Sequence, residues 1–230
     1  MDARDLPRYS AAAAGRLVGL GSWRVRRWLQ GYNYTYIAGP LDEERIGHKG
    51  PIVQRPADVT SFASFIELVD LLFVKEFVAC GLSLQKIRRA LEEAERMLGD
   101  NHFAKRRFFT DGKRIYLQVK NKAEALLELL SGGQWVIAPI ILQLAKHIDF
   151  ARSSGLAQRW YPLGTEGQVV VDPAISFGRP TIAGTGILTA NVFDLYTAEK
   201  ARTRQVSYWL NLKPAQVRAA VSFEQSLLAA

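Results

Sequence analysis

Residues 10–32 read SAAAAGRLVGLGSWRVRRWLQGY, a pattern typical of two short helices joined by a tight turn. Ser10 offers a hydroxyl N-cap to a first helix over Ala11–Val18. Glycines then break the pattern, and Ser22 can cap a second helix over Trp23–Leu29. Another glycine follows that helix. The segment therefore predicts a helix-turn-helix motif.

The side chains of this helix pair divide into a core set and a surface set. Small residues at Ala11–Ala14 let the second helix cross the first closely. The predicted shared core consists of Leu17, Val18, Leu20, Val25 and Trp28. In such motifs the N-terminal residues of the second helix meet base edges in the major groove. The predicted DNA-binding residues here are Ser22, Trp23, Arg24, Arg26 and Arg27. The alternative is a helical hairpin with a solvated arginine face.

The next segments predict a loop and two longer helices. Residues 33–56 indicate a loop or short strands, because Gly-Pro pairs interrupt them. Ser61 or Ser64 caps a helix that continues to Cys80, with apolar residues at three- and four-residue spacing. Ser83 caps another helix, which ends before Gly99.

A basic β-hairpin is predicted after these helices. Asp111-Gly112 separates the β-prone runs 106–110 and 113–119, and an Asp-Gly pair favours a tight hairpin turn. A basic hairpin beside a helix-turn-helix resembles a wing that contacts phosphate or the minor groove. Its predicted DNA-binding residues are Lys105, Arg106, Arg107, Lys113 and Arg114. A solvated hairpin within a larger sheet is the alternative.

Connecting elements are expected between this hairpin and the C-terminal segment. They are a helix over Asn121–Leu130, a strand near Trp135, and a helix from Pro139 to about Phe150. The polar, glycine-containing stretch Ala151–Gly167 places a domain boundary in or before it.

The C-terminal segment predicts a strand, a turn-rich stretch and three helices. The strand covers Gln168–Val171, and the helices cover about Ala190–Lys200, Gln205–Leu210 and Pro214–Leu228. Asn211 closes the second of them. Their predicted core consists of Val206, Trp209, Leu210, Leu212, Val217, Ala220, Val221 and Leu227.

These elements predict a mostly α fold with small β elements. We expect a winged helix-turn-helix domain over residues 1–120, connecting helices over 121–167, and a small three-helix domain, itself helix-turn-helix-like, over 168–230.

The charge of the chain favours an acidic partner. Thirty Lys and Arg residues stand against 22 Asp and Glu residues, giving a net charge of +8. Such a balance is typical of proteins that bind nucleic acid, an acidic protein or a membrane surface. A solvated basic surface without a partner is the alternative. The basic residues concentrate in two blocks, 1–27 and 103–122.

Several function classes are excluded or disfavoured by the residues. Charged residues interrupt the longest apolar run, Phe62–Ala79, so no membrane span is expected. With Cys80 as the only cysteine, an intrachain disulfide is impossible, and a cytoplasmic location fits. His48, His102 and His147 lie far apart in sequence. No nucleophile–base set, metal cage or phosphate loop can be argued, so we expect neither enzymatic activity nor a cofactor.

Two segments resemble known families. The order of elements over Ser10–Tyr32 and Phe62–Val119 resembles the DNA-binding part of MerR-like winged-helix regulators, somewhat rearranged. The sequence Gly-Arg-Pro-Thr-Ile-Ala-Gly-Thr at 178–185, followed by Val217-x-x-Ala-Val-x-Phe-Glu, resembles the antitoxin domain of unknown function four-thirty-three. Gly186 stands where that family usually has an arginine, so no contact of that arginine carries over.

Together the two segments look like VapB-type antitoxins, which are encoded beside PIN-domain ribonuclease toxins. This resemblance implies a homodimer that binds its own operator DNA and neutralises the toxin. It suggests partner-binding roles for Arg179, Pro180, Thr185, Phe223 and Glu224. Arg179 either reaches an acidic partner or bonds backbone carbonyls within a turn. Other readings are a MerR-like regulator without a toxin and a protein-interaction module that binds no DNA.

Overall fold

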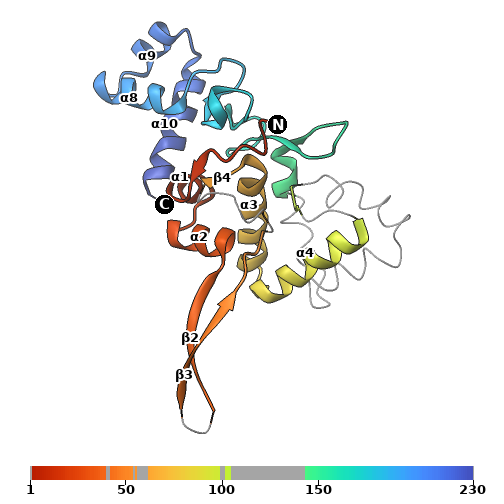
Figure 1. Ribbon diagram of the computed structural model, residues 1–230. Helices are drawn as coiled ribbons and strands as arrows, with labels where there is room; N and C mark the ends of the chain where they lie inside the picture. The colour runs from red at the N-terminus through yellow and green to blue at the C-terminus, as the bar shows by residue number, and fades with distance from the viewer. Residues whose placement is uncertain are drawn as a thin grey trace.

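A computed structural model describes residues 2–39, 42–53, 55, 62–98, 102–104 and 143–229 of the chain. A long two-stranded hairpin extends from the body, and the C-terminal helices lie at the opposite end of the molecule (Figure 1). The fold is mostly α with small antiparallel sheets, as the sequence predicts.

The N-terminal elements form the predicted helix pair and two β pairings. Their bounds are β1 Tyr9–Ser10, α1 Ala11–Val18, α2 Ser22–Gln30, β2 Tyr32–Ala38, β3 Glu43–Lys49 and β4 Phe62–Ala63. Strand β1 pairs antiparallel with β4, and β2 pairs antiparallel with β3. The second helix begins one residue earlier than predicted, with Gly21 rather than Ser22 at the N-cap.

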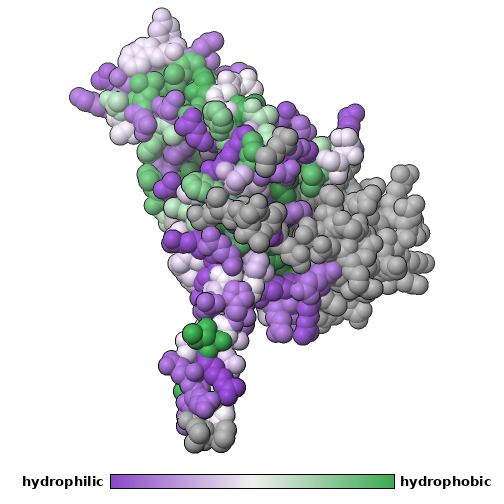
Figure 2. All heavy atoms as spheres, viewed as in Figure 1, coloured by the Kyte–Doolittle hydropathy of each residue, from purple (hydrophilic) through white to green (hydrophobic). Residues whose placement is uncertain are grey.

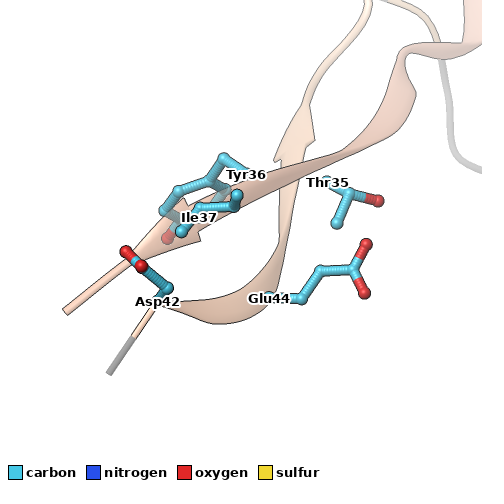
Figure 3. Close-up of a pocket in the computed structure, with 5 residues that line it drawn as sticks. All are labelled: Thr35, Tyr36, Ile37, Asp42 and Glu44. Atoms are coloured by element: carbon cyan, nitrogen blue, oxygen red, sulfur yellow. The ribbon is translucent and has the colours of Figure 1, made fainter. Parts of the chain in front are cut away.

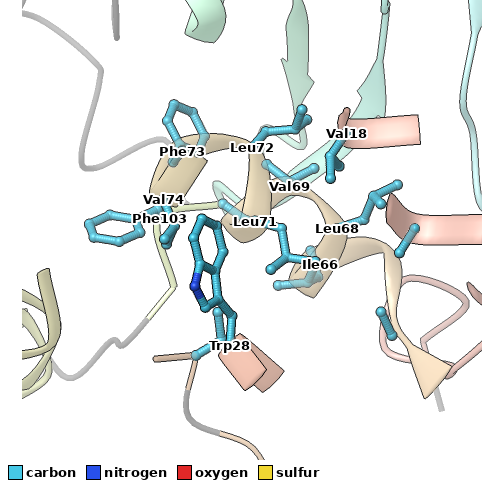
Figure 4. Packing of buried hydrophobic residues seen from close by; sticks show 14 of the residues in the cluster. Val18, Trp28, Ile66, Leu68, Val69, Leu71, Leu72, Phe73, Val74 and Phe103 are labelled. Carbon is cyan, nitrogen blue, oxygen red and sulfur yellow. The ribbon is translucent and has the colours of Figure 1, made fainter. Parts of the chain in front are cut away.

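Helices α3 (Phe65–Ala79) and α4 (Leu84–Leu98) follow the predicted bounds closely. Ser64 caps α3 reciprocally: the Glu67 amide donates to Ser64 Oγ at 3.2 Å, and the Ser64 amide donates to Glu67 Oε2 at 2.7 Å. Most side chains of α3 are buried, and Figure 4 shows Trp28 from α2 and Phe103 packed beside it. Helix α3 is therefore the centre of the larger apolar core.

One buried carboxylate lies inside this core. Asp70 is 1% exposed, accepts a hydrogen bond from the Ala104 amide at 2.8 Å, and lies 2.6 Å from His102 Nδ1. Burial alone would lower the pKa of His102, but the charge and hydrogen bond of Asp70 outweigh it and raise that pKa. Asp70 therefore ties residues 102–104 to α3.

The predicted helix to Phe150 is wrong at its end. Residues 143–146 are helical, and the chain then forms strand β5 (Ile148–Phe150), paired antiparallel with β6 (Ala157–Trp160). The strand is favoured over a longer helix because Ile148 lies opposite Trp160, and both side chains are buried in the larger core. Part of the stretch expected to mark a boundary thus contributes to that core.

The C-terminal elements build a second, smaller core. Their bounds are β7 Val169–Val170, the 3-10 turn η2 Ser176–Gly178, β8 Thr181–Ile182, α8 Thr189–Ala198, α9 Thr203–Leu210 and α10 Pro214–Leu228. Strands β7 and β8 pair antiparallel. The predicted helices and the Asn211 cap, which has φ of 51°, are confirmed. The prediction that Trp209 belongs to this core is wrong, because the residue is 50% exposed.

Within the described parts of the chain, no helix is long and apolar enough to cross a membrane.

Candidate nucleic-acid interface

The crossing of α1 and α2 is close and well anchored. A Cβ atom on Gly15 would lie 2.4 Å from the Leu20 carbonyl oxygen, so this position needs glycine. Lys75 of α3 donates to the Val18 carbonyl at 2.9 Å and holds the end of α1. On α2, Val25, Trp28 and Leu29 are buried. The orientation of α2 on the body is therefore fixed by packing.

The opposite face of α2 carries the residues predicted to bind DNA. Arg24, Arg26 and Arg27 are exposed, and Ser22 is half-buried. Trp23 is 53% exposed, and the guanidinium groups of Arg24 and Arg27 lie 5.2 and 5.6 Å from its ring centroid. Such cation–π contacts hold arginines in place while leaving their donors free. The structure thus brings this predicted set together on one surface.

A second part of the surface was missed from the sequence. Where a loop or short strands were predicted, β2 and β3 form a seven-pair antiparallel ladder from Tyr32↔Lys49 to Ala38↔Glu43. Gly31 makes the junction with α2 possible: its φ is 76°, and a Cβ atom there would lie 2.4 Å from the Lys49 carbonyl oxygen. The alternation of tyrosines in this segment is a strand signal that the neighbouring glycines and prolines obscured.

The hairpin continues the basic, aromatic character of α2. Tyr32, Tyr34 and Tyr36 share one face, with ring centroids 6.2 and 5.8 Å apart. Arg27 lies 3.6 Å from the Tyr32 centroid, and its hydrogen bond to the hydroxyl lowers the pKa of Tyr32. Lys49 lies 5.3 Å from the Tyr34 ring. We call the surface formed by Trp23, Arg24, Arg27, Tyr32, Tyr34 and Lys49 the α2–hairpin surface.

Gly47 of β3 leaves room for the Tyr34 ring on this face of the hairpin. Gly47 lies opposite Tyr34, and a Cβ atom on it would lie 2.5 Å from the tyrosine ring. The ring therefore lies across the bare backbone of β3. At the base of the hairpin, Arg88 of α4 donates to the Gly50 carbonyl at 2.9 Å and anchors the returning strand.

The tip of the hairpin has the opposite charge. A shallow hollow there is lined by Thr35, Tyr36, Ile37, Asp42 and Glu44 (Figure 3). Arg45 is paired with Glu43 at 3.0 Å. The projection is largely hydrophilic in Figure 2, with one hydrophobic patch, and Ile37 and Ile46 are its most exposed apolar residues. The positive side chains of the α2–hairpin surface therefore lie on α2 and at the base of the hairpin, whereas the tip is acidic.

The basic hairpin predicted over 106–119 lies outside the described residues. The same holds for its five predicted DNA-binding residues, Lys105, Arg106, Arg107, Lys113 and Arg114. They stay predictions.

The residues predicted to bind a partner in the C-terminal segment differ in accessibility. Arg179 is exposed, and its Nε lies 3.5 Å from the Ser176 carbonyl oxygen. The alternative to partner binding predicts a contact of this kind within the turn. The Pro180 carbonyl and the Thr185 hydroxyl hold turns by local hydrogen bonds. Phe223 is 3% exposed, and Glu224 accepts a hydrogen bond from Thr189. Phe223 is therefore buried and Glu224 half-buried, and the predicted partner-binding roles of all five residues stay predictions.

The turn-rich C-terminal stretch is joined to the strand that precedes α1. Tyr9 Oη donates to the Gly178 carbonyl at 2.7 Å, and burial raises the pKa of this hydroxyl. Gly178 has φ of 77°, and a Cβ atom on it would lie 2.2 Å from Tyr9 Oη. Arg8 donates to the Pro173 carbonyl at 2.7 Å and lies 5.5 Å from the Phe177 ring centroid.

Residues 169–223 match the family described as Protein of unknown function (DUF433). The match covers the segment in which 178–185 and 217–224 carried the resemblance. Over 199 residues the chain is 23% identical to a Mycobacterium tuberculosis protein named Putative antitoxin VapB45, with 82% of each chain covered. These two findings support a likeness to antitoxins.

A solved structure shares the fold over almost the whole chain. It is the crystal structure of Rv2018 from Mycobacterium tuberculosis, with a TM-score of 0.66 and 22% identity. The superposition covers 94% of this chain and 98% of that one. The architecture of the described elements is therefore one that a natural protein adopts. The MerR-like comparison remains a prediction.

Proposed function

We propose that this protein is the antitoxin of a toxin–antitoxin pair. In this proposal it neutralises a PIN-domain ribonuclease in the cytoplasm and, as a dimer, binds operator DNA to repress its own operon. It acts by binding and catalyses no reaction. The toxin half of the proposal rests on the similarity to the antitoxin named above.

The observation that carries the DNA half is the α2–hairpin surface. A short, exposed, arginine-bearing helix is followed directly by a hairpin, which is where a wing follows the recognition helix in winged-helix proteins. We place α2 in the major groove, with Trp23 and Arg24 nearest the bases. Lys49 and the tyrosines at the hairpin base then lie along the phosphate backbone. In this proposal the β2–β3 hairpin acts as a wing, and the basic hairpin predicted over 106–119 stays a separate prediction.

The charges along the hairpin determine which part of it contacts DNA in this proposal. Arg27 and Lys49 lie near its base, whereas Asp42 and Glu44 line its tip. Phosphates repel carboxylates, so the tip points away from the duplex in the bound state. In this arrangement the affinity depends mainly on a few arginine and lysine contacts, and therefore falls with salt.

Fluorescence anisotropy with a duplex from the region upstream of the protein's own gene tests the DNA half. Removing one base contact and one phosphate contact with Arg24→Ala and Arg27→Ala should weaken binding at least about 100-fold and lower the salt slope by about one. Arg152→Ala is the matched control, since Arg152 is exposed in the β5–β6 turn, away from α2. Equal binding by the double variant and the wild type would refute this assignment of the recognition helix.

Co-expression with the product of the adjacent gene tests the toxin half. We expect the two proteins to co-purify as a stable complex. Binding of the upstream duplex without any complex would instead favour the regulator that lacks a toxin.

A further inference from the structure

Helix α9 exposes two consecutive aromatic side chains. Tyr208 is 82% exposed and Trp209 is 50% exposed, whereas Val206 of the same helix is fully buried. Neither ring contacts another ring or a cation among the described residues. The fold gains little from their apolar surface. Exposed aromatic residues of this kind are enriched at protein interfaces and often dominate their binding energy.

The stretch of sequence that contains α9 carries positive charges only. Residues 200–223 contain no Asp or Glu. The exposed cations of this stretch are Lys200, Arg202, Arg204, Lys213 and Arg218. In the described parts of the chain, none of their side chains forms an ion pair. The basic groups around α9 are therefore available to a partner.

Backbone contacts at its two ends hold helix α9 in place. Before α9, the Ala201 amide donates to the Tyr196 carbonyl at 2.9 Å across a turn of positive φ. After it, Asn211 caps the helix in the left-handed conformation, and Leu212 enters the smaller core. Because both ends of α9 are held, a partner would meet a preformed surface and lose little ordering entropy.

We infer that the patch of Arg204, Tyr208, Trp209 and Lys213 docks an acidic protein, namely the toxin of the proposed function, on which this inference rests. Arg204 and Tyr208 are four residues apart on α9 and so lie on one face of the helix, and Lys213 follows the helix at the start of α10. The complementary face carries an apolar pocket for the rings, bordered by carboxylates. The rings supply affinity, and the cations steer association.

A protein fits this patch better than a nucleic acid does. Consecutive helix residues diverge by about 100°, so Tyr208 and Trp209 cannot present parallel faces to successive bases. In the hairpin, by contrast, tyrosines at alternate positions share one face. Helix α9 and the hairpin also lie at opposite ends of the molecule (Figure 1).

Isothermal titration with the purified product of the adjacent gene tests the inference on the full-length chain. Tyr208→Ala with Trp209→Ala should weaken binding at least about 30-fold. Leu228→Ala is the matched control, because Leu228 is 75% exposed in the same part of the fold but lies at the end of α10. Arg204→Glu with Lys213→Glu should slow association and reduce its dependence on salt. Thermal melts check that each variant is folded.

The possible outcomes separate the inference from the proposed function. Equal binding by the aromatic double variant and the wild type overturns the inference and leaves the proposed function standing. If the wild type does not bind the adjacent product, both are overturned. If the double variant loses duplex DNA or self-association but keeps the protein partner, the patch is a DNA or dimer surface, and the inference is wrong.

Discussion

The α2–hairpin surface and the α9 patch use the same residue types in different geometries. Each is built on a short helix that exposes a tryptophan and at least one arginine. On α2 the tryptophan lies beneath Arg24 and Arg27, and the aromatic series continues along a strand. On α9 the rings are bare and diverge. The difference teaches that spacing, not composition, separates a surface suited to a polyanion from one suited to a protein.

The two surfaces are distant but not independent of the fold between them. Arg8 donates to the Pro173 carbonyl before η2, and Tyr9 donates to the Gly178 carbonyl within η2. Both residues belong to the segment that leads into α1. These two hydrogen bonds connect the C-terminal segment to the helix pair.

The largest effect is expected from Gly31→Val, which attacks only one of the two surfaces. The positive φ and the 2.4 Å approach to the Lys49 carbonyl oxygen force the hairpin base to shift. We expect the free energy of unfolding to fall by roughly 1–3 kcal/mol, as measured by urea denaturation. Duplex binding should be largely lost, while the adjacent gene's product still binds. Gly50→Ala is the control, because a Cβ atom there meets nothing within 4 Å.

A graded effect along the tyrosine series would sharpen the comparison. Tyr34→Ala should weaken duplex binding about fivefold to tenfold, because it removes a ring beside Lys49. Tyr36→Ala should have a smaller effect, since Tyr36 lines the acidic hollow at the tip. Anisotropy titrations measure both. A larger loss for Tyr36 would mean that the tip, not the base, contacts DNA.

The smallest effect concerns pH and separates the two cores. The pKa of His102 is raised in the folded state by Asp70, so the protonated pair stabilises the larger core at low pH. Stability from this pair is fully present below the unfolded pKa and is lost as pH rises through the folded pKa. The melting temperature of the wild type, measured by thermal melts, should therefore fall from pH 6 to pH 9 relative to that of His102→Gln. Parallel curves for the two proteins would show that the pair contributes nothing.

Local signals predicted the helices well because their caps are written in the sequence. Ser64 with Glu67 marks the start of α3, and Asn211 marks the end of α9. The prediction for the hairpin segment stayed at a loop or short strands, because the glycines and prolines around its alternating tyrosines obscured the strand signal. Its junction depends on Gly31 meeting Lys49, a contact that exists only after folding.

The errors elsewhere have related causes. The helix expected to reach Phe150 ends early, because pairing of Ile148 with Trp160 is a tertiary contact. Trp209 was assigned to the core by its hydrophobicity alone, but the small cluster is already filled by residues such as Val206 and Leu212. The arginine face of α2 was predictable because Val25, Trp28 and Leu29 define the buried side by helical spacing.

The central claim is that one chain holds a protein partner and duplex DNA at opposite ends. A mobility-shift assay of the co-purified complex, on DNA from upstream of the gene, tests it most directly. The account predicts a single shifted species that contains both proteins, is lost with Arg24→Ala and Arg27→Ala, and loses only the partner with Tyr208→Ala and Trp209→Ala. Displacement of the partner by DNA, or of DNA by the partner, would contradict it.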